Sequence, residues 1–263
     1  MENLDPIVHY WLVGHPTISQ FEFKHGQTFG ATLLFPIVSI FIYLSFTILA
    51  LRFPSFLPIV SAATLRRITA THNLTLCILS LIIAVGCGLS VLHEMTCTCS
   101  RLDLDHLIHL FWGYVFYLSK ILEFLDTLLI LLSSSRSRRL SFLHVYHHSL
   151  VLLLCYFCVS AGQSMLHVGV IINASVHVLM YAYYFLSAIG KRPRWKKLVT
   201  DVQIGQFIFG LVCLGAAMYY HFTSEFGCSG IGVWFFIFSF DVSLLALFLN
   251  FHFKTYAKNS KKP

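Results

Sequence analysis

Long apolar blocks alternate with short polar segments along the whole chain. Each block holds about 20 residues, the length at which an α-helix crosses the hydrocarbon core of a bilayer. The fold class we expect is an all-α polytopic membrane protein, with residues 1–263 forming a single integral-membrane domain. The blocks predict seven transmembrane helices, near residues 28–51, 68–92, 107–132, 142–160, 164–189, 202–222 and 229–252.

Composition supports the membrane assignment and excludes other classes of protein. Hydrophobic residues make up 57% of the chain and charged residues 11%, whereas a soluble domain carries about 25% charged residues. A water-soluble globular domain is therefore excluded. The net charge is +7, but the basic residues lie in the loops between apolar blocks. We expect no nucleic-acid partner, because such a partner needs basic residues gathered on one surface.

The distribution of lysine and arginine predicts the orientation in the membrane. Fifteen of the 18 basic residues fall on the side that the chain reaches after its first span. Basic loops stay in the cytosol, so the C-terminus is predicted to be cytosolic and the N-terminus to lie on the other side. Cys97, Cys99 and Cys228 fall in the two non-cytosolic loops. An oxidising compartment on that side would favour one disulfide between these loops.

Charged residues interrupt the third predicted span. Lys120, Glu123, Asp126 and Thr127 occupy roughly one third of the helix circumference at 100° per residue. Each charge near the bilayer centre costs about 2.5 to 3.5 kcal/mol, so we expect the three charged residues to pair and to face the bundle interior. Two interpretations remain open: a structural ion pair that fixes helix packing, or a direct role in a functional site.

The fourth span begins with a histidine box. His144, His147 and His148 follow an i, i+3, i+4 spacing, which places the three imidazoles on one side of a helix at its predicted cytosolic end. Two chemistries fit this box. Neutral imidazoles bind metal ions, and histidine itself acts as a nucleophile or as a general acid and base.

The fifth and sixth spans also carry polar stripes near the same end. These stripes consist of Asn173, His177, Tyr181 and Tyr184 in span five, and of Gln203 and Gln206 in span six. The polar groups of four spans therefore converge beside basic loops. A buried polar cavity with a cationic rim suits an anionic substrate with an apolar tail.

Four ordered motifs resemble those of the ELO-type very-long-chain fatty acid elongases, the condensing enzymes of the endoplasmic reticulum. The short acidic N-terminus and the length look most similar to plant-type members. The motifs are Lys120-x2-Glu123-x2-Asp126-Thr127, His144-x2-His147-His148, Asn173-x3-His177-x2-Met180-Tyr181-x-Tyr183-Tyr184 and Thr200-x2-Gln203-x2-Gln206.

The resemblance implies a fold and an activity. It implies seven helices, six of which form an inverted barrel around a narrow acyl tunnel. The implied reaction, the first step of very-long-chain fatty acid elongation, condenses long-chain acyl-CoA with malonyl-CoA and releases 3-oxoacyl-CoA, carbon dioxide and CoA. It would proceed by a ping-pong route through an acyl-histidine, with no metal and no other cofactor. The implied partners are membrane lipid and the reductases and dehydratase of the elongation cycle, and a homodimer is left open.

The resemblance also implies roles for individual residues. His147 would be the nucleophile, His148 and His177 would position groups or transfer protons, and His144 and Asn173 would support them. The residues expected to contact substrate are Lys120, Glu123, Asp126, Tyr181, Tyr184, Gln203 and Gln206. Basic residues expected either to hold the CoA phosphates or merely to set topology include Arg136, Arg139, Arg194, Lys197 and Lys254.

The implied location is the endoplasmic reticulum membrane, with a lumenal N-terminus and a cytosolic C-terminus. The location rests on the resemblance, because the C-terminal Lys261-Lys262-Pro263 does not complete a dilysine retrieval signal. In that oxidising lumen we expect a disulfide between Cys228 and Cys99, with Cys97 as the less favoured partner.

Other classes of membrane protein compete with this interpretation. A di-iron lipid desaturase or hydroxylase is the alternative enzyme, because such enzymes also use HxxHH boxes. However, its metal centre would need several such boxes, and this chain has one. A seven-helix receptor or transporter would leave the four ordered motifs unexplained.

Overall fold

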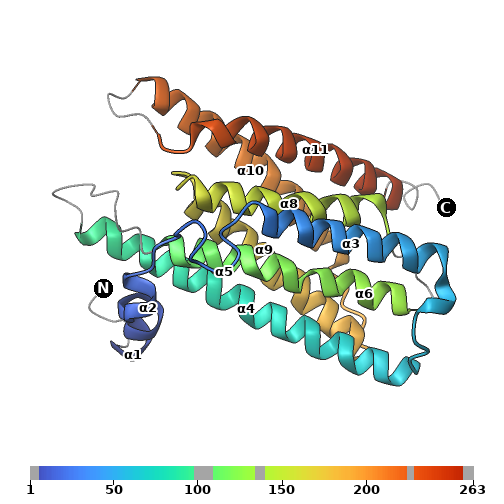
Figure 1. The fold of residues 1–263 in the computed structure, drawn as a ribbon. Coiled ribbons are helices and arrows are strands. Elements are labelled where there is room, and N and C mark those ends of the chain that lie inside the picture. The colour runs from blue at the N-terminus through green and yellow to red at the C-terminus, as the bar shows by residue number, and fades with distance from the viewer. Residues whose placement is uncertain (1–5, 98–108, 134–139, 224–227, 257–263) are drawn as a thin grey trace.

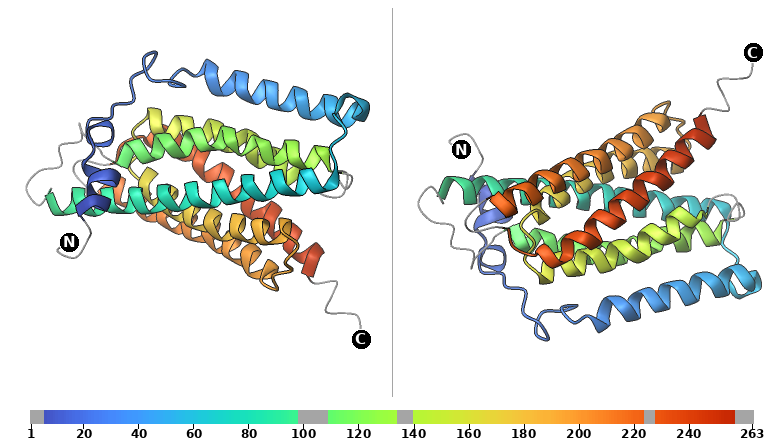
Figure 2. Two further views of the ribbon diagram at one scale, coloured as in Figure 1. Left: turned by 90° about the horizontal axis from the view of Figure 1, so that it is seen from below. Right: turned by 90° about the horizontal axis from the view of Figure 1, so that it is seen from above.

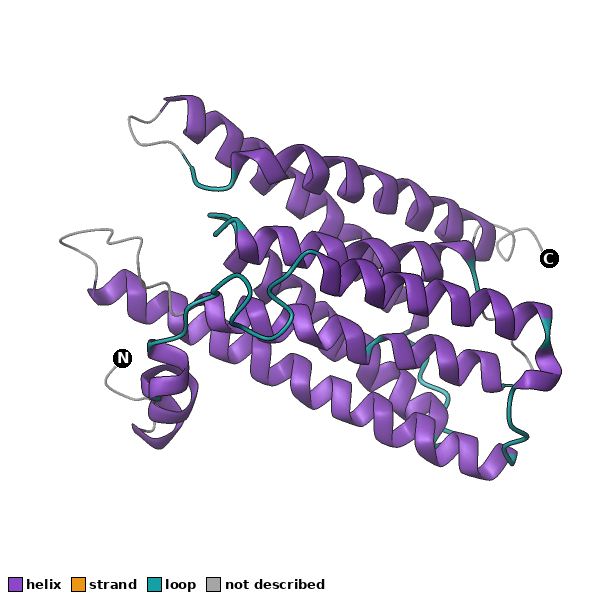
Figure 3. Cartoon of the chain, in the orientation of Figure 1, coloured by secondary structure: helices purple, strands orange, loops and turns teal. Residues whose placement is uncertain are grey.

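The computed structural model describes residues 6–97, 109–133, 140–223 and 228–256, and its regular elements there are all helices (Figure 3). Short elements precede and follow the first long helix: α1 (Pro6–His9), a π-helix (Tyr10–Gly14), α2 (Pro16–Ser19) and a 3₁₀ turn (Pro54–Phe56). The longer helices are α3 (Leu34–Arg52), α4 (Ala62–Cys97), α5 (His109–Leu122), α6 (Phe124–Leu132), α8 (Phe142–Ser160), α9 (Leu166–Ala188), α10 (Lys196–Thr223) and α11 (Ile231–Tyr256).

Six of the described helices are long and apolar enough to cross a membrane: α3, α4, α8, α9, α10 and α11. The predicted all-α polytopic fold is confirmed. Helices α4 and α10 are longer than the apolar blocks 68–92 and 202–222, because each extends into polar sequence at the end where it begins. The apolar block alone therefore underestimates these two helices.

The expected span 107–132 is two helices rather than one. Helix α5 ends at Leu122 and α6 begins at Phe124, with Glu123 between them at φ −65° and ψ −18°. The Asp126 N–H donates to the Glu123 carbonyl oxygen at 3.0 Å, an i to i+3 bond that tightens the turn in the manner of a 3₁₀ helix. Neither helix spans a bilayer alone, so the count of seven spans stays a prediction.

Contacts between helices in the described part of the chain close a ring. The order around the ring is α4, α9, α10, α11, α8 and α5, and α5 returns to α4. Helix α3 packs outside this ring, against α8 and α6, and stands apart from the other helices in Figure 2. The ring agrees with the six-helix arrangement implied by the resemblance. Figure 1 shows that α3 ends and α4 begins at the same end of the bundle as the last turn of α11.

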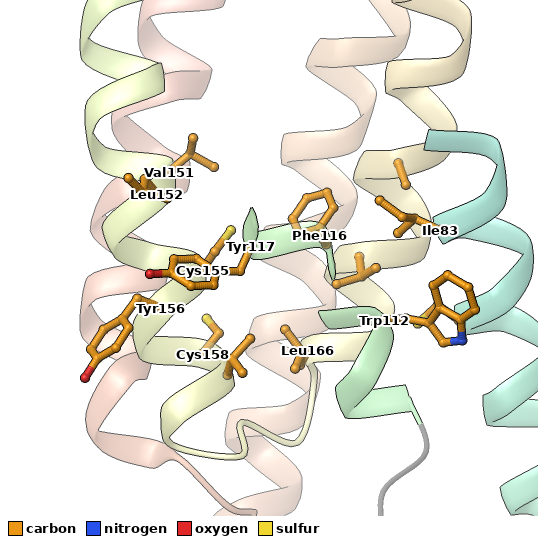
Figure 4. Packing of buried hydrophobic residues seen from close by; sticks show 14 of the residues in the cluster. Ile83, Trp112, Phe116, Tyr117, Val151, Leu152, Cys155, Tyr156, Cys158 and Leu166 are labelled. Carbon is orange, nitrogen blue, oxygen red and sulfur yellow. The ribbon is translucent and has the colours of Figure 1, made fainter. Parts of the chain in front are cut away.

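Close packing holds the ring together on its α4, α5 and α8 side. Tyr117 and Leu152 have no exposed surface, and they lie in a cluster with Trp112 and Ile83 (Figure 4). Lipid is as apolar as these side chains, so association rests on close packing rather than on a hydrophobic drive. Gly86 permits this packing, because a Cβ atom there would lie 2.3 Å from the Trp112 ring.

Candidate functional site

A buried ion pair lies where α5 meets α6. The Lys120 Nζ atom lies 2.7 Å from Glu123 Oε1, and the two side chains are 0% and 2% exposed. The same Glu123 oxygen lies 3.4 Å from His177 Nδ1, and the second oxygen lies 4.0 Å from His148 Nδ1. The prediction that these charges face the bundle interior and pair is confirmed. Glu123 therefore links the histidine box on α8 to the polar stripe on α9.

Asp126 binds two partners on other helices. Its Oδ1 atom lies 2.9 Å from His72 Nε2 on α4, and its Oδ2 atom accepts a hydrogen bond of 2.8 Å from the Tyr181 hydroxyl on α9. His72 belongs to none of the four sequence motifs. The signal for it was present, because a polar residue four positions inside the predicted span 68–92 needs a partner in the bundle.

Thr127 connects the outer helix to the histidine box. Its hydroxyl lies 2.9 Å from the Tyr43 hydroxyl on α3 and 2.8 Å from His144 Nε2 on α8. His144 therefore lies against α6 and helps to join three helices. This placement gives His144 a supporting position, one layer away from the cavity described below.

The three histidines of the box face different surroundings. Ser141 caps α8, because its hydroxyl accepts the N–H of His144 at 3.2 Å, and the box occupies the first turns that follow. The His148 ring lies between its neighbours, with centroids 4.4 Å from His144 and 5.2 Å from His147. The His147 ring stacks on Phe240 of α11, with ring centroids 6.4 Å apart.

His147 lines a cavity of about 170 Å³ between α8, α9, α10 and α11. Asn173 and Gln206 line it as well, and the carbonyl oxygens of their side chains are buried without a hydrogen-bond partner among the described residues. Most other lining side chains are apolar, such as Val151, Leu154 and further residues toward Leu214. The cavity thus joins a polar zone, which holds an imidazole and two amides, to an apolar channel.

Comparison with known proteins identifies the family. A model of the ELO family, described as the GNS1/SUR4 family, matches residues 28–263. The chain belongs to the ELO family. It is 34% identical to fatty acid elongase A of Dictyostelium discoideum over 259 residues, which cover 93% of this chain and 91% of that protein.

Vertebrate members of the ELO family are similarly related to this chain. Very long chain fatty acid elongase 2 of Rattus norvegicus is 34% identical over 214 residues, which cover 76% of this chain and 73% of that protein. Very long chain fatty acid elongase 5 of Homo sapiens is 35% identical over 159 residues, 58% of this chain and 50% of that protein. The similarity to plant-type members stays a prediction.

Some residues expected at the site lie away from the cavity. Gln203 donates from Nε2 to Met180 Sδ at 3.4 Å, and Tyr184 is 43% exposed and contacts the Tyr181 ring at 6.2 Å. Three basic residues expected at the rim are exposed: Arg194 in the turn before α10, Lys197 at the start of α10 and Lys254 in the last turn of α11. Arg136 and Arg139 lie outside the described residues.

The expected disulfide also stays a prediction. Cys99 lies outside the described residues, and the Cys228 thiol donates to the Ala217 carbonyl oxygen at 3.7 Å. Cys228 has no disulfide partner among the described cysteines.

Within residues 6–97, 109–133, 140–223 and 228–256, no three side chains of histidine, cysteine, aspartate or glutamate converge closely enough to bind a metal ion. The side chains at the polar zone of the cavity are imidazole and amide groups. These groups support nucleophilic attack, proton transfer and hydrogen bonding to a substrate carbonyl.

Proposed function

We propose that this member of the ELO family condenses a long-chain acyl-CoA with malonyl-CoA to give 3-oxoacyl-CoA, carbon dioxide and CoA. The observation that carries the proposal is the position of His147. Of the three histidines in the box, it is the one that lines the cavity, and no hydrogen bond joins it to another described residue. An imidazole that forms no hydrogen bond with another described residue and lines a cavity is available as a nucleophile.

The first half-reaction transfers the acyl group to the enzyme. A ring nitrogen of neutral His147 attacks the thioester carbonyl carbon, a C–N bond forms, and the C–S bond breaks to release CoA as a thiolate. The other ring nitrogen of His147 then gives up its proton and the thiolate takes up a proton, so a neutral acyl-imidazole and free CoA thiol result. The apolar walls around the cavity keep water from the acyl-imidazole that results, so the activated acyl group is protected from hydrolysis.

The second half-reaction forms the new carbon–carbon bond. Malonyl-CoA loses carbon dioxide, and the electron pair of the broken bond attacks the acyl carbonyl carbon. The C–N bond to His147 then breaks, and the released imidazole takes up a proton. Negative charge develops on two carbonyl oxygens during these steps. Side-chain amide N–H groups of Asn173 and Gln206, at the polar end of the cavity, would donate hydrogen bonds to such an oxygen.

The buried ion pair supports this chemistry from behind the cavity. Glu123 lies between His148 and His177, so its carboxylate would stabilise either imidazole if it becomes protonated. Lys120 holds that carboxylate in place. We assign His148 and His177 to positioning and proton transfer, and His144 to support through Thr127.

The surroundings of the site suggest where substrates enter. The polar zone lies toward the end of the bundle where Arg52, Arg66, Arg67 and Lys254 are placed at helix ends. Cationic side chains there would hold the phosphates of CoA while the acyl chain enters the cavity. We assign this end to the cytosolic face of the endoplasmic reticulum membrane, where the reductases and dehydratase of the cycle would receive the product.

The test is an assay of the purified full-length protein in detergent with labelled malonyl-CoA and acyl-CoA substrates of increasing length. We expect labelled 3-oxoacyl-CoA that is two carbons longer than the acyl substrate. Without malonyl-CoA, we expect release of up to one CoA per enzyme. Absence of condensation with every acyl-CoA tested, from folded protein, would reject the activity. Condensation without CoA release before malonyl-CoA is added would reject the acyl-enzyme route.

A further inference from the structure

An acidic side chain lies in the apolar part of the cavity. Asp241 of α11 lines the channel together with Cys158 of α8 and Cys213 of α10. No hydrogen bond or ion pair joins its carboxyl group to another described residue. An ionisable residue inside a membrane span is costly and marks a functional position by default. The condensation mechanism above makes no use of this group.

The neighbouring helix leaves room for the Asp241 carboxyl group. Gly210 of α10 lies opposite, and a Cβ atom at that position would lie 2.9 Å from Asp241 Oδ2. Any larger residue at position 210 would therefore displace the carboxyl group. The α10–α11 contact thus accommodates an acid at the cavity wall, where an apolar residue would have packed without needing a partner.

The position of Asp241 places it beside the acyl chain rather than beside the reacting carbonyl. Gly210 follows Gln206 by four residues, about 6 Å along α10. The cavity continues past this level to Leu214, Met165 and Gln163. An acyl chain that fills the channel from the polar zone would therefore pass Asp241.

We propose that Asp241 selects acyl chains that carry a hydroxyl group at the depth of Gly210. The proposal rests on the function proposed above and narrows its substrate class. An unsubstituted chain would displace water from the carboxyl group and offer it no hydrogen bond, which is unfavourable in an apolar surrounding. A hydroxyl group at the right carbon would donate to the carboxylate. The channel therefore binds a hydroxylated acyl chain more tightly than an unsubstituted chain of the same length.

The size of the effect follows from the strength of hydrogen bonds to charged groups. One such hydrogen bond strengthens binding by about ten- to hundredfold relative to a chain that cannot form it. Cys158 and Cys213 line the same stretch, but thiols are weak donors and acceptors and would not replace the carboxylate. Selection should therefore depend on Asp241 and on the position of the hydroxyl group along the chain.

The experiment measures binding separately from catalysis. Purified full-length protein in detergent is titrated with S-alkyl-CoA thioethers, which lack the reactive carbonyl, either plain or with one hydroxyl group moved stepwise along the chain. We expect one hydroxyl position to bind about tenfold or more tightly than the plain chain. Asp241→Leu should lose that preference and bind the plain chain at least as tightly as the original protein does.

Two further variants keep the test decisive. Val242→Leu changes the adjacent residue, which is 42% exposed and absent from the cavity lining, and it should keep the preference. Asp241→Asn serves if the leucine variant does not fold, and it should weaken the preference because a neutral amide accepts a weaker bond. Equal binding of all chains by the original protein, or a preference unchanged in Asp241→Leu, would overturn the proposal. Failure of condensation with malonyl-CoA would instead concern the proposed function.

Discussion

The two sides of the α8 helix differ in how their polar groups are satisfied. On the side of α5 and α6, Lys120, Glu123 and Asp126 pair with one another or with residues of other helices. On the side of the cavity, His147, Asn173 and Asp241 line the cavity wall with polar atoms that form no hydrogen bond with another described residue. Paired groups hold helices in place, whereas unpaired groups at a cavity are available to a substrate.

This comparison predicts that the largest effect on activity comes from the cavity side. His147→Ala should reduce condensation by about 10²- to 10⁴-fold or more, because the nucleophile is lost while no interhelical bond is broken. His25→Ala, at an exposed position before the first long helix, is the matched control and should retain activity. The assay is product formation from labelled malonyl-CoA, with thermal unfolding measured in parallel. Near-normal condensation by the variant would place the chemistry elsewhere.

On the paired side, the main effect should be on stability. Glu123→Gln leaves the buried Lys120 ammonium without its carboxylate, which should cost about 3–5 kcal/mol in the free energy of unfolding. The double variant Lys120→Met/Glu123→Gln should be less damaged than Glu123→Gln, because no charge is left unpaired. Denaturant titration in detergent measures both. If the double variant is less stable than Glu123→Gln, the unpaired charge of Lys120 does not explain the loss of stability.

Two glycines of α4 differ in how closely their neighbours pack against them. Gly86→Ala would force the Trp112 ring to move and should cost about 1–3 kcal/mol. Gly88→Ala meets nothing within 4 Å and should be neutral or stabilising by up to about 1 kcal/mol, since alanine favours the helix. Thermal unfolding of both variants checks the sign. Equal effects would show that α4 and α5 do not pack as closely as described.

The smallest expected effect on stability comes from removing one hydrogen bond that Asp126 accepts. Tyr181→Phe removes the donor to Asp126, while His72 still binds that carboxylate. Hydrogen bonds between membrane helices contribute about 0.6–1.7 kcal/mol, so the loss in stability should fall in that range. Tyr219→Phe, at a tyrosine that is 73% exposed, is the control. A loss as large as that of Glu123→Gln would mean that Tyr181 does more than hold Asp126.

The fold was predictable from the sequence, because the length of an apolar block indicates whether a helix can span a membrane. The interval 142–160 coincides with α8, since Ser141 caps the helix at one end and Gly162 follows its other end. The break at Glu123 was not predictable, because Lys120, Glu123 and Asp126 continue a helical stripe across it. Glu123 and Asp126 bind partners on α4, α8 and α9, and helical periodicity gives no information about such tertiary contacts.

The candidate site was predictable in its residue types and less so in their arrangement. The motifs identified His147, Asn173 and Gln206, which the structure brings to one cavity. Spacing did not show which histidine of the box faces that cavity, because the i, i+3, i+4 positions all lie on one side of the helix. Asp241 was visible as a lone acid in the block 229–252, but its direction depends on how α11 packs against α10.

Mass spectrometry of the acylated enzyme identifies the residue that accepts the acyl group. Purified full-length protein is incubated with acyl-CoA in the absence of malonyl-CoA, quenched and digested. We expect one acyl group on His147, removed when malonyl-CoA is added before quenching, and no acylation of His147→Ala. An acyl group on His144, His148, His177 or a cysteine, with His147 unmodified in the active protein, would contradict the account.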